Sequence, residues 1–219
     1  MSLVIALAGK REIVVAGDTL LRTGDEDGFY RSRVPFPKIF CQNAESHFVV
    51  GHAGSSSSRH YLKDESSLDK ASFRETVESY KTAIDEQYTM NRVPSQFVIA
   101  GFEKGQPQIY HCVCDDFKTQ LAQADLGRLA IGIGGHGAMY LIHRYHENEM
   151  SLDQLLLLGC FGLQEAIRFD GRVANPLQVA VVQPDKRPKF LSEDAIDAIN
   201  ARCENIHTAI QNLFLQGPK

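Results

Sequence analysis

The opening residues, MSLVIALAGKREIVVAGDT, place a serine at position 2 and an aspartate at position 18. A serine at the start of a chain can be activated by its own α-amine, whose pKa of roughly 8 makes it a base near neutral pH. Ser2 gains this chemistry only when Met1 is removed, because an extended or acylated amine cannot act as the base. Serine is small enough for removal by the usual processing peptidase to be expected. Ser2 is therefore a candidate nucleophile.

Two aliphatic runs must position these residues. Leu3 to Ala8 and Ile13 to Ala16 are separated by Gly9-Lys10-Arg11-Glu12, which predicts a hairpin of two largely buried strands. The segment RTGDEDGFYRSRVPFP follows and is predicted to be a loop. A strand over Lys38 to Cys41 resumes after it. This arrangement sets Asp18 at the polar end of a strand whose partner starts beside Ser2.

The rest of the chain alternates strands and amphipathic helices. The strand His47 to Gly51 runs into HAGSSSS, where glycine and serines are predicted to open a helix. Apolar spacing predicts further helices over Leu68 to Tyr88, Ala138 to Glu147, Leu152 to Phe169 and from Ser192 onward, and strands over Phe97 to Phe102, Gln108 to Cys114, Arg128 to Ile133 and Leu177 to Gln183. This order favours antiparallel sheets covered by helices over a parallel βαβ succession.

Composition narrows the class of protein. The 219 residues are long enough for one core, so a single domain over 1–219 is expected. A formal net charge of -4 with dispersed basic residues argues against nucleic acid or an anionic membrane as a partner. The five cysteines show no paired CxxC spacing, which favours reduced thiols in the cytoplasm and gives no metal or cofactor site.

Short motifs in this order resemble a known family. The segments SLVIALAGKREIVVAGD, KIF, VVGHAG and AIGIGGHG are similar to the β-type subunits of proteasomes and their bacterial relatives, which are N-terminal nucleophile hydrolases. The spacing from Ser2 to Asp18 matches the family's spacing from nucleophile to first aspartate. The opening MSLVIA also resembles archaeal proteasome-like proteins that join peptides. The resemblance implies an α+β fold, a four-layer αββα sandwich of two antiparallel sheets between helical layers.

The resemblance implies a role for each matching residue. Ser2 would be the nucleophile, Lys38 the cation beside it, and Asp18 the partner that orients Lys38. The Gly54 N–H would stabilise the oxyanion, and Asp170 falls on the family's later aspartate. Two positions depart from the pattern, because Ile133 and Val173 stand where the family has polar serines.

The same resemblance implies a substrate pocket of mixed apolar and polar character. Leu21, Phe36, His52 and Ser56 match positions that line the family's pocket. Each of the singled-out residues also has a structural interpretation: Lys38 as a solvated strand end, Gly54 as turn chemistry, and Asp170 as a helix-exit turn. His143 and His146 are interpreted as solvated, and Cys112 and Cys114 as core residues sharing one strand face.

The sequence thus predicts an N-terminal serine hydrolase that cleaves peptide amide bonds through an acyl-enzyme after Met1 is removed. One alternative is a peptide ligase that uses the same acyl-enzyme, and another is a catalytically inactive structural subunit of a proteasome-like assembly. Peptide or protein is the expected substrate. A homo-oligomeric ring and an ATPase partner are expectations that the resemblance adds.

Overall fold

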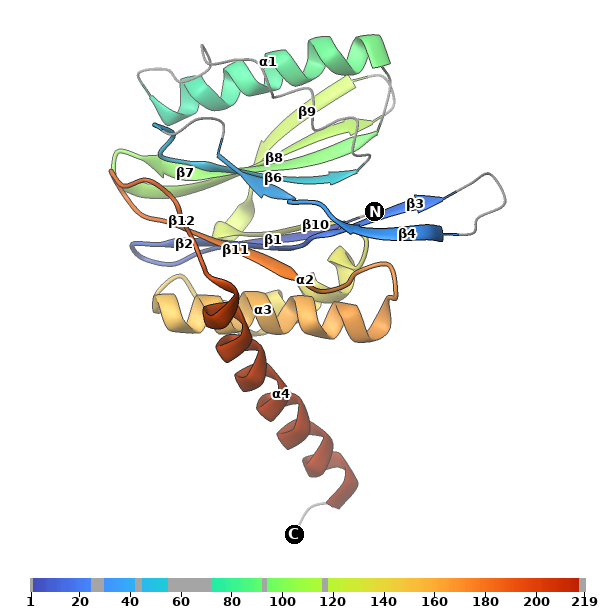
Figure 1. The fold of residues 1–219 in the computed structure, drawn as a ribbon. Helices are drawn as coiled ribbons and strands as arrows, with labels where there is room; N and C mark the ends of the chain where they lie inside the picture. Colours follow the sequence, from blue (N-terminus) through green and yellow to red (C-terminus); the bar gives the residue numbers. More distant parts are fainter. Residues whose placement is uncertain are drawn as a thin grey trace.

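Two antiparallel five-stranded sheets lie face to face between helices in the computed structural model of this chain (Figure 1). The structure describes residues 2–24, 30–41, 45–54, 72–91, 94–115 and 118–216. The fold is an α+β sandwich, as the sequence predicted. Across the described ranges, no helix combines the length and the apolar composition needed to cross a membrane.

The first sheet contains the start of the chain. Its order is β10-β1-β2-β11-β12, formed by Arg128–Gly132, Leu3–Ala8, Ile13–Asp18, Leu177–Val182 and Lys189–Phe190. The predicted hairpin is confirmed, with Val4 opposite Gly17 and Ala8 opposite Ile13. On its other edge β1 pairs with β10, so the first strand is an internal strand of its sheet.

The second sheet has the order β5-β6-β7-β8-β9. Its strands are Ile39–Phe40, Val49–Gly54, Ser95–Glu103, Gln106–Asp115 and Lys118–Gln123. The strand β9 was missed in the sequence because its KTQLAQ is mostly polar and its side chains are largely exposed, so only weak alternation marks it.

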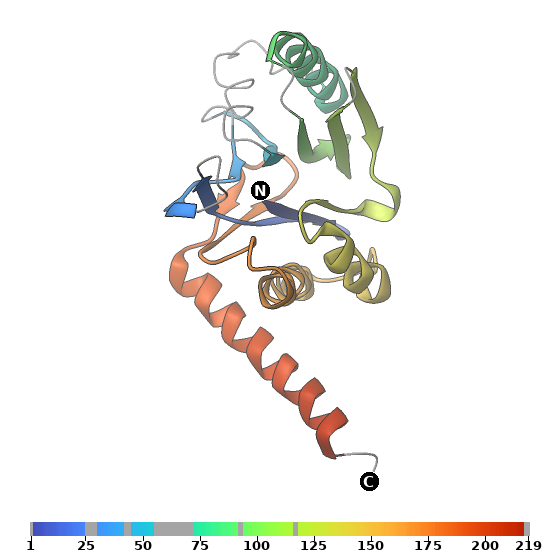
Figure 2. The same ribbon diagram turned by 90° about the vertical axis from the view of Figure 1, so that its right-hand side faces the viewer.

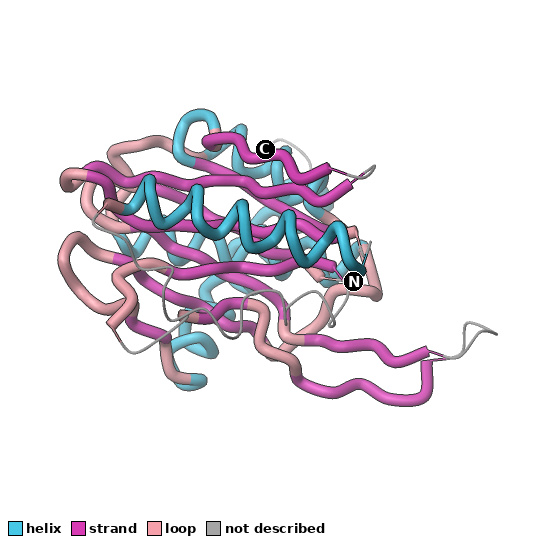
Figure 3. The backbone as a smooth tube through the Cα atoms, turned by 90° about the horizontal axis from the view of Figure 1, so that it is seen from above, coloured by secondary structure: helices cyan, strands magenta, loops and turns pink. Residues whose placement is uncertain are grey.

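The segment predicted as a loop after Leu21 is instead partly a strand pair. The strands β3, Leu20–Gly24, and β4, Tyr30–Pro35, pair antiparallel as a separate two-stranded sheet, with Leu21 opposite Val34. This ribbon extends from the side of the sandwich near the start of the chain (Figures 1 and 3). These strands were not predicted because their sequence is rich in glycine and charged residues and lacks the apolar alternation that marks a strand packed on a core.

Helices cover both outer faces. The helix α1, Phe73–Asn91, lies along the strands of the second sheet (Figure 3), and α2, Gly135–Tyr145, and α3, Leu152–Phe169, cover the first. A short 3-10 turn, Asp125–Gly127, precedes β10. The helix α1 begins later than the predicted Leu68; residues 55–71 lie outside the described ranges.

Alternation along β1 shows how the layers are held together. Leu3, Ile5 and Leu7 face the α2–α3 layer, whereas Val4 and Ala6 pack between the two sheets. Both faces are therefore buried, which explains the unbroken aliphatic run in the sequence. A capping box begins α3: the Ser151 Oγ accepts the Gln154 N–H, and the Gln154 Oε1 accepts the Ser151 N–H.

The last helix, α4, Glu193–Gln216, begins against the sandwich and then runs away from it (Figures 1 and 2). Ile196, Ile199 and Cys203 near its start are buried. Near its end, Leu213 is 75% exposed and Phe214 is 83% exposed. The helix extends beyond the sandwich, so its last turns have no neighbouring element in the described structure to cover them.

Candidate active site

Ser2 lies at the start of β1, and only 1% of its surface is exposed. Its carbonyl oxygen accepts the Ile133 N–H at 2.9 Å, which extends the β1–β10 pairing by one residue. Its Oγ is buried and has no hydrogen-bond partner among the described residues. A buried hydroxyl in this state is costly unless another group meets it, so the position is a candidate for chemistry.

Asp18 lies beside Ser2, as the register predicted. It is the last residue of β2 and is fully buried. Its Oδ1 accepts the Leu3 N–H at 2.7 Å, and its Oδ2 accepts the Leu20 N–H at 3.2 Å. One carboxylate therefore holds the residue that follows Ser2 and the first residue of β3.

Lys38 is the buried cation of this group, with 2% of its surface exposed. Its Nζ donates to the Leu20 carbonyl at 3.0 Å and lies 5.3 Å from the centre of the Phe36 ring. Asp18 attracts it electrostatically. The interpretation of Lys38 as a solvated strand end is wrong, since a buried ammonium must be paired and hydrogen-bonded.

The charges around Asp18 oppose the effect of its burial. Burial raises the pKa of the Asp18 carboxyl, and the Leu3 N–H, the Lys38 ammonium and the Leu20 N–H each act to lower it. The net direction is upward. Asp18 therefore accepts a proton at a higher pH than an exposed aspartate does.

Gln178, which the sequence did not single out, holds the backbone that carries Lys38. Its Oε1 accepts the N–H groups of Lys38 and Ile39 at 3.1 and 3.0 Å, and its Nε2 donates to the Ile39 carbonyl at 2.7 Å. Gln178 belongs to β11 of the first sheet and Ile39 to β5 of the second. The signal was a polar residue inside the apolar strand LQVAVV.

Gly54 ends β6. The His52 N–H donates to the Lys38 carbonyl at 2.8 Å, and successive N–H groups along a strand point to opposite sides. The Gly54 N–H therefore points toward Lys38's side of the strand. Continuing the same register would place Phe36 opposite Gly54. The Phe36 N–H donates to the Thr19 carbonyl oxygen. The expectation that Gly54 lies on a turn was wrong, and the helix predicted over the serines after it falls outside the described residues.

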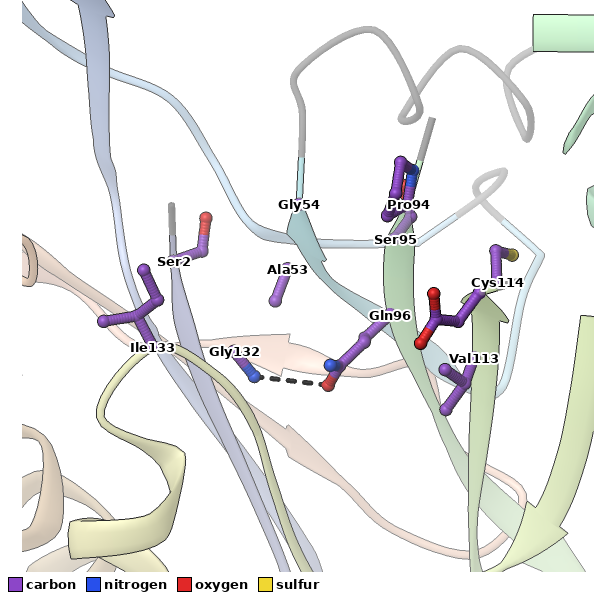
Figure 4. A pocket seen from close by; sticks show the side chains of 11 residues that line it. Ser2, Ala53, Gly54, Pro94, Ser95, Gln96, Val113, Cys114, Gly132 and Ile133 are labelled. Atoms are coloured by element: carbon purple, nitrogen blue, oxygen red, sulfur yellow. Dashed lines mark hydrogen bonds between the residues drawn. The ribbon is translucent and has the colours of Figure 1, made fainter. Parts of the chain in front are cut away.

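A cavity of about 350 Å³ opens beside Ser2 (Figure 4). Ser2 and Gly54 both line it, so the structure brings the candidate nucleophile and the candidate oxyanion donor to one space. Gln96 and Val113 of the second sheet and Gly132 and Ile133 of the first also line it. The cavity therefore lies between the two sheets, with residues of both in its lining.

Gly132 has no room for a side chain. Its φ is +88°, and a Cβ there would overlap the Ser2 carbonyl oxygen. Its N–H donates to the Gln96 Oε1 at 3.3 Å, shown as the dashed line in Figure 4. This bond could not be predicted from the sequence, because Gln96 is a single polar residue just before a predicted strand.

Asp170 follows the last residue of α3. It caps the C-terminus of α3 and binds Arg172 through both carboxylate oxygens, at 2.8 and 2.7 Å. It does not line the cavity. Val173 is buried in the core beside α3, whereas Ile133 lines the cavity. Two positions that are polar in the family are thus apolar here, one in the core and one facing the cavity.

The predicted substrate pocket is only partly described. Phe36 lies by Lys38, and His52 is buried in β6 with its ring centre 5.0 Å from that of Phe97. His52 therefore lies within a strand and not before a helix. The Leu21 side chain and all of Ser56 are outside the described residues. Of the two whose side chains are described, Phe36 and His52, neither lines the described cavity.

Cysteine and histidine side chains outside this group are buried in two cases that the sequence analysis singled out. Cys112 and Cys114 are buried core residues, as predicted. His146 was predicted to be solvated, which is wrong, because it is buried and its Nε2 lies 2.8 Å from the Ala8 carbonyl. Within the described ranges, no group of three or more histidine, cysteine, aspartate or glutamate side chains is placed to hold a metal ion.

The sandwich, with its first strand internal to one sheet, is the proteasome-like fold of known structures. The structures that show this are of Anbu proteins. The helical assembly of the Anbu complex from Pseudomonas aeruginosa has a TM-score of 0.79 and 17% identity, covering 99% of this chain and 97% of that one. Anbu (ancestral beta-subunit) from Yersinia bercovieri gives 0.75 and 19%, covering 99% and 97%. Anbu from Hyphomicrobium sp. strain MC1 gives 0.77 and 16%, covering 99% and 98%.

No protein-family model matches the chain, and no curated protein sequence does. The resemblance to proteasome β subunits drawn from short motifs was wrong, because the structural neighbours are Anbu proteins, a separate proteasome-like family. The motifs misled because they are short, and proteins that share a fold can share such short matches. They do not separate one branch of that fold from another.

Proposed function

We propose that this chain is an N-terminal serine hydrolase that cleaves peptide amide bonds once Met1 has been removed. The observation that carries the proposal is the Asp18 carboxylate, which accepts the Leu3 N–H at 2.7 Å while lying beside the buried Lys38. This carboxylate therefore contacts Leu3, the residue after Ser2, and is also influenced by the charge of Lys38. The unpartnered Ser2 Oγ and the cavity beside it support the same function.

In the acylation step, the Ser2 Oγ attacks the carbonyl carbon of the substrate peptide bond and passes its proton to its own α-amine. The Lys38 ammonium disfavours protonation of that amine before the reaction, which keeps it available as a base. A tetrahedral oxyanion forms, and the Gly54 N–H donates to it. The C–N bond then breaks, the leaving amine takes the proton, and an ester on Ser2 remains.

In the deacylation step, water attacks the ester carbon while the α-amine accepts its proton. The Oγ–C bond breaks, Ser2 regains its proton, and the product leaves as a carboxylic acid. A preorganised donor such as the Gly54 N–H typically stabilises such transition states by about 2.7 to 4 kcal/mol. No metal or cofactor takes part in either step.

The experiment begins with the intact mass of the purified protein, which reports whether Met1 is lost. The protein is then treated with an electrophilic peptide probe, and labelling is followed by mass spectrometry. Ser2→Ala and Lys38→Ala are expected to abolish labelling. Lys10→Ala is the matched control, because Lys10 is an exposed lysine paired with Glu149. Retention of Met1 in the native host, or persistent labelling of Ser2→Ala, would overturn the proposal.

We also propose that the chain assembles with copies of itself. The Pseudomonas aeruginosa relative is described as a helical assembly, which is a statement about that protein. In this chain, the exposed apolar end of α4, formed by Leu213, Phe214 and Leu215, supports the proposal. Monomeric proteins rarely expose contiguous apolar side chains of this size. Light scattering of the purified protein tests it.

A further inference from the structure

The cavity and the predicted substrate pocket lie on different sides of β6. Side chains alternate along a strand, so His52 and Ala53 point to opposite faces. His52 contacts Phe97 on the face that α1 covers, whereas Ala53 packs between the two sheets and lines the cavity. Gly54 lies where the two regions meet. The described cavity is thus on the other side of β6 from His52.

An extended peptide bound at Ser2 must pass the nucleophile at its cleaved bond, with about 3.3 to 3.6 Å of chain per residue on each side. If the half before the bond lies on the side of Phe36 and His52, the half after it must lie on the opposite side. The described cavity is on that opposite side. The first residues of β7 and the last residues of β8 line it (Figure 4).

We propose that this cavity binds the part of the peptide substrate that follows the cleaved bond, and that Gln96 and Val113 determine how well that part is held. The inference rests on the proposed function. The cavity must also hold the group that attacks the Ser2 ester, because the incoming nucleophile takes the position that the leaving amine vacates. Water there gives hydrolysis, and a peptide amine gives ligation.

Gln96 supplies the polar contact. The Gly132 N–H can only donate, so the atom of Gln96 that meets it at 3.3 Å is the carbonyl oxygen. The Nε2 group, with two donors, is then left for another acceptor, and Gln96 lines the cavity. The carbonyl oxygens of a peptide backbone are acceptors of this kind. Gln96 is therefore suited to bind the substrate backbone just after the cleaved bond.

Val113 and Ile133 supply an apolar wall. Val113 lies opposite Gln96 in the β7–β8 register, and Ile133 follows Gly132 on the first sheet. Both line the cavity and are only partly buried by the protein, so a substrate side chain placed there would cover them. Asp115 also lines the cavity, and Lys118 lies opposite it in the β8–β9 register. The wall therefore favours uncharged side chains of moderate size.

The test compares two substrates with the same acyl half. One releases a small aminocoumarin dye, and the other releases an uncharged tripeptide that reaches into the cavity. In Gln96→Glu, the side chain keeps an oxygen for the Gly132 N–H but loses the two donors. We expect the ratio of kcat/KM for the tripeptide substrate to kcat/KM for the dye substrate to fall about tenfold. Val113→Phe, which fills the cavity, is expected to lower the same ratio.

The matched control is Gln106→Glu, at an exposed glutamine that begins β8 at the opposite end from Val113, and it is expected to leave the ratio as in the wild type. A ratio within twofold of the wild type in both Gln96→Glu and Val113→Phe would overturn the inference. Thermal melting checks that each variant folds. Failure of the proposed function looks different, because the wild type would then show no labelling by a probe that carries only the acyl half.

Discussion

The Leu3 N–H donates to Oδ1 of Asp18 at 2.7 Å, across fifteen positions of sequence. This bond fixes the first residue of β1 to the last residue of β2 at the point where the antiparallel ladder ends. The same carboxylate is attracted to the buried Lys38. The candidate nucleophile is thus one peptide bond from a residue that is held by a buried carboxylate, and that carboxylate feels the charge of a buried lysine.

We expect Asp18→Asn to damage both stability and reactivity. Asparagine keeps an oxygen for the Leu3 N–H, but Lys38 then keeps a buried positive charge that Asp18 no longer offsets. Removing one partner of a buried pair costs about 3 to 5 kcal/mol of unfolding free energy. Labelling of Ser2 by an electrophilic probe should slow by about 10²-fold. Urea denaturation and labelling kinetics measure the two effects.

Asp153→Asn is the control for that experiment, because Asp153 forms an exposed ion pair with Arg202. Such pairs contribute little, so its stability should stay near that of the wild type. If Asp18→Asn were as stable as Asp153→Asn, the Asp18–Lys38 pair would have no structural role.

Much of this group could be predicted from the sequence, since Ser2, Asp18, Lys38 and Gly54 stand in a fixed register along strands that pair locally. The hairpin fixes Ser2 and Asp18, because its turn is short and both strands are aliphatic. Gln96 and Gln178 could not be predicted in the same way. Each acts across a contact between the two sheets, and such long-range contacts leave no local periodicity.

Gly132→Ala tests the close approach of β10 to the start of the chain. The added Cβ would overlap the Ser2 carbonyl oxygen, and alanine at φ +88° is strained. We expect a loss of about 1 to 3 kcal/mol of unfolding free energy. Loss of Ser2 labelling should accompany it.

Gly137→Ala is the matched glycine variant. Gly137 lies in α2, and a Cβ there meets nothing within 4 Å. Alanine in a helix should raise the unfolding free energy by about 0.4 to 1 kcal/mol. Equal effects of the two variants would contradict the packing at Gly132.

Acid should weaken the fold through His146. Burial lowers the pKa of His146 below its ordinary value of 6.5, so the unfolded chain binds the proton more tightly than the folded chain. Stability is therefore retained above pH 6.5 and lost as the pH falls from 6.5 through the folded-state pKa. Thermal melting between pH 8 and pH 5 measures the loss.

His146→Gln should reduce that loss, since its amide can donate to the Ala8 carbonyl, which His146 now contacts, and does not titrate. His143→Gln, on the exposed face of α2, serves as the control and should melt with the same pH dependence as the wild type. A wild-type slope that survives unchanged in His146→Gln would assign the effect to another group.

The exposed end of α4 should govern assembly and not folding. Leu213→Glu with Phe214→Glu removes apolar surface that the rest of the described chain leaves open to solvent. We expect a shift to smaller species in light scattering at an unchanged melting temperature of the dilute protein. Ser79→Glu, an exposed change on α1, is the control. No shift in size would remove α4 from the proposed contact between copies.

The placement of β1 between β10 and β2 has a consequence for how this protein opens. Chain ends usually fray first, and their amides exchange with deuterium within seconds to minutes. Here the amides of Leu3 to Ala8 are held on both edges, so they should exchange only when the whole sandwich comes apart. The chemically interesting end of the chain is then among its most slowly exchanging parts, and the looser end is the far end of α4.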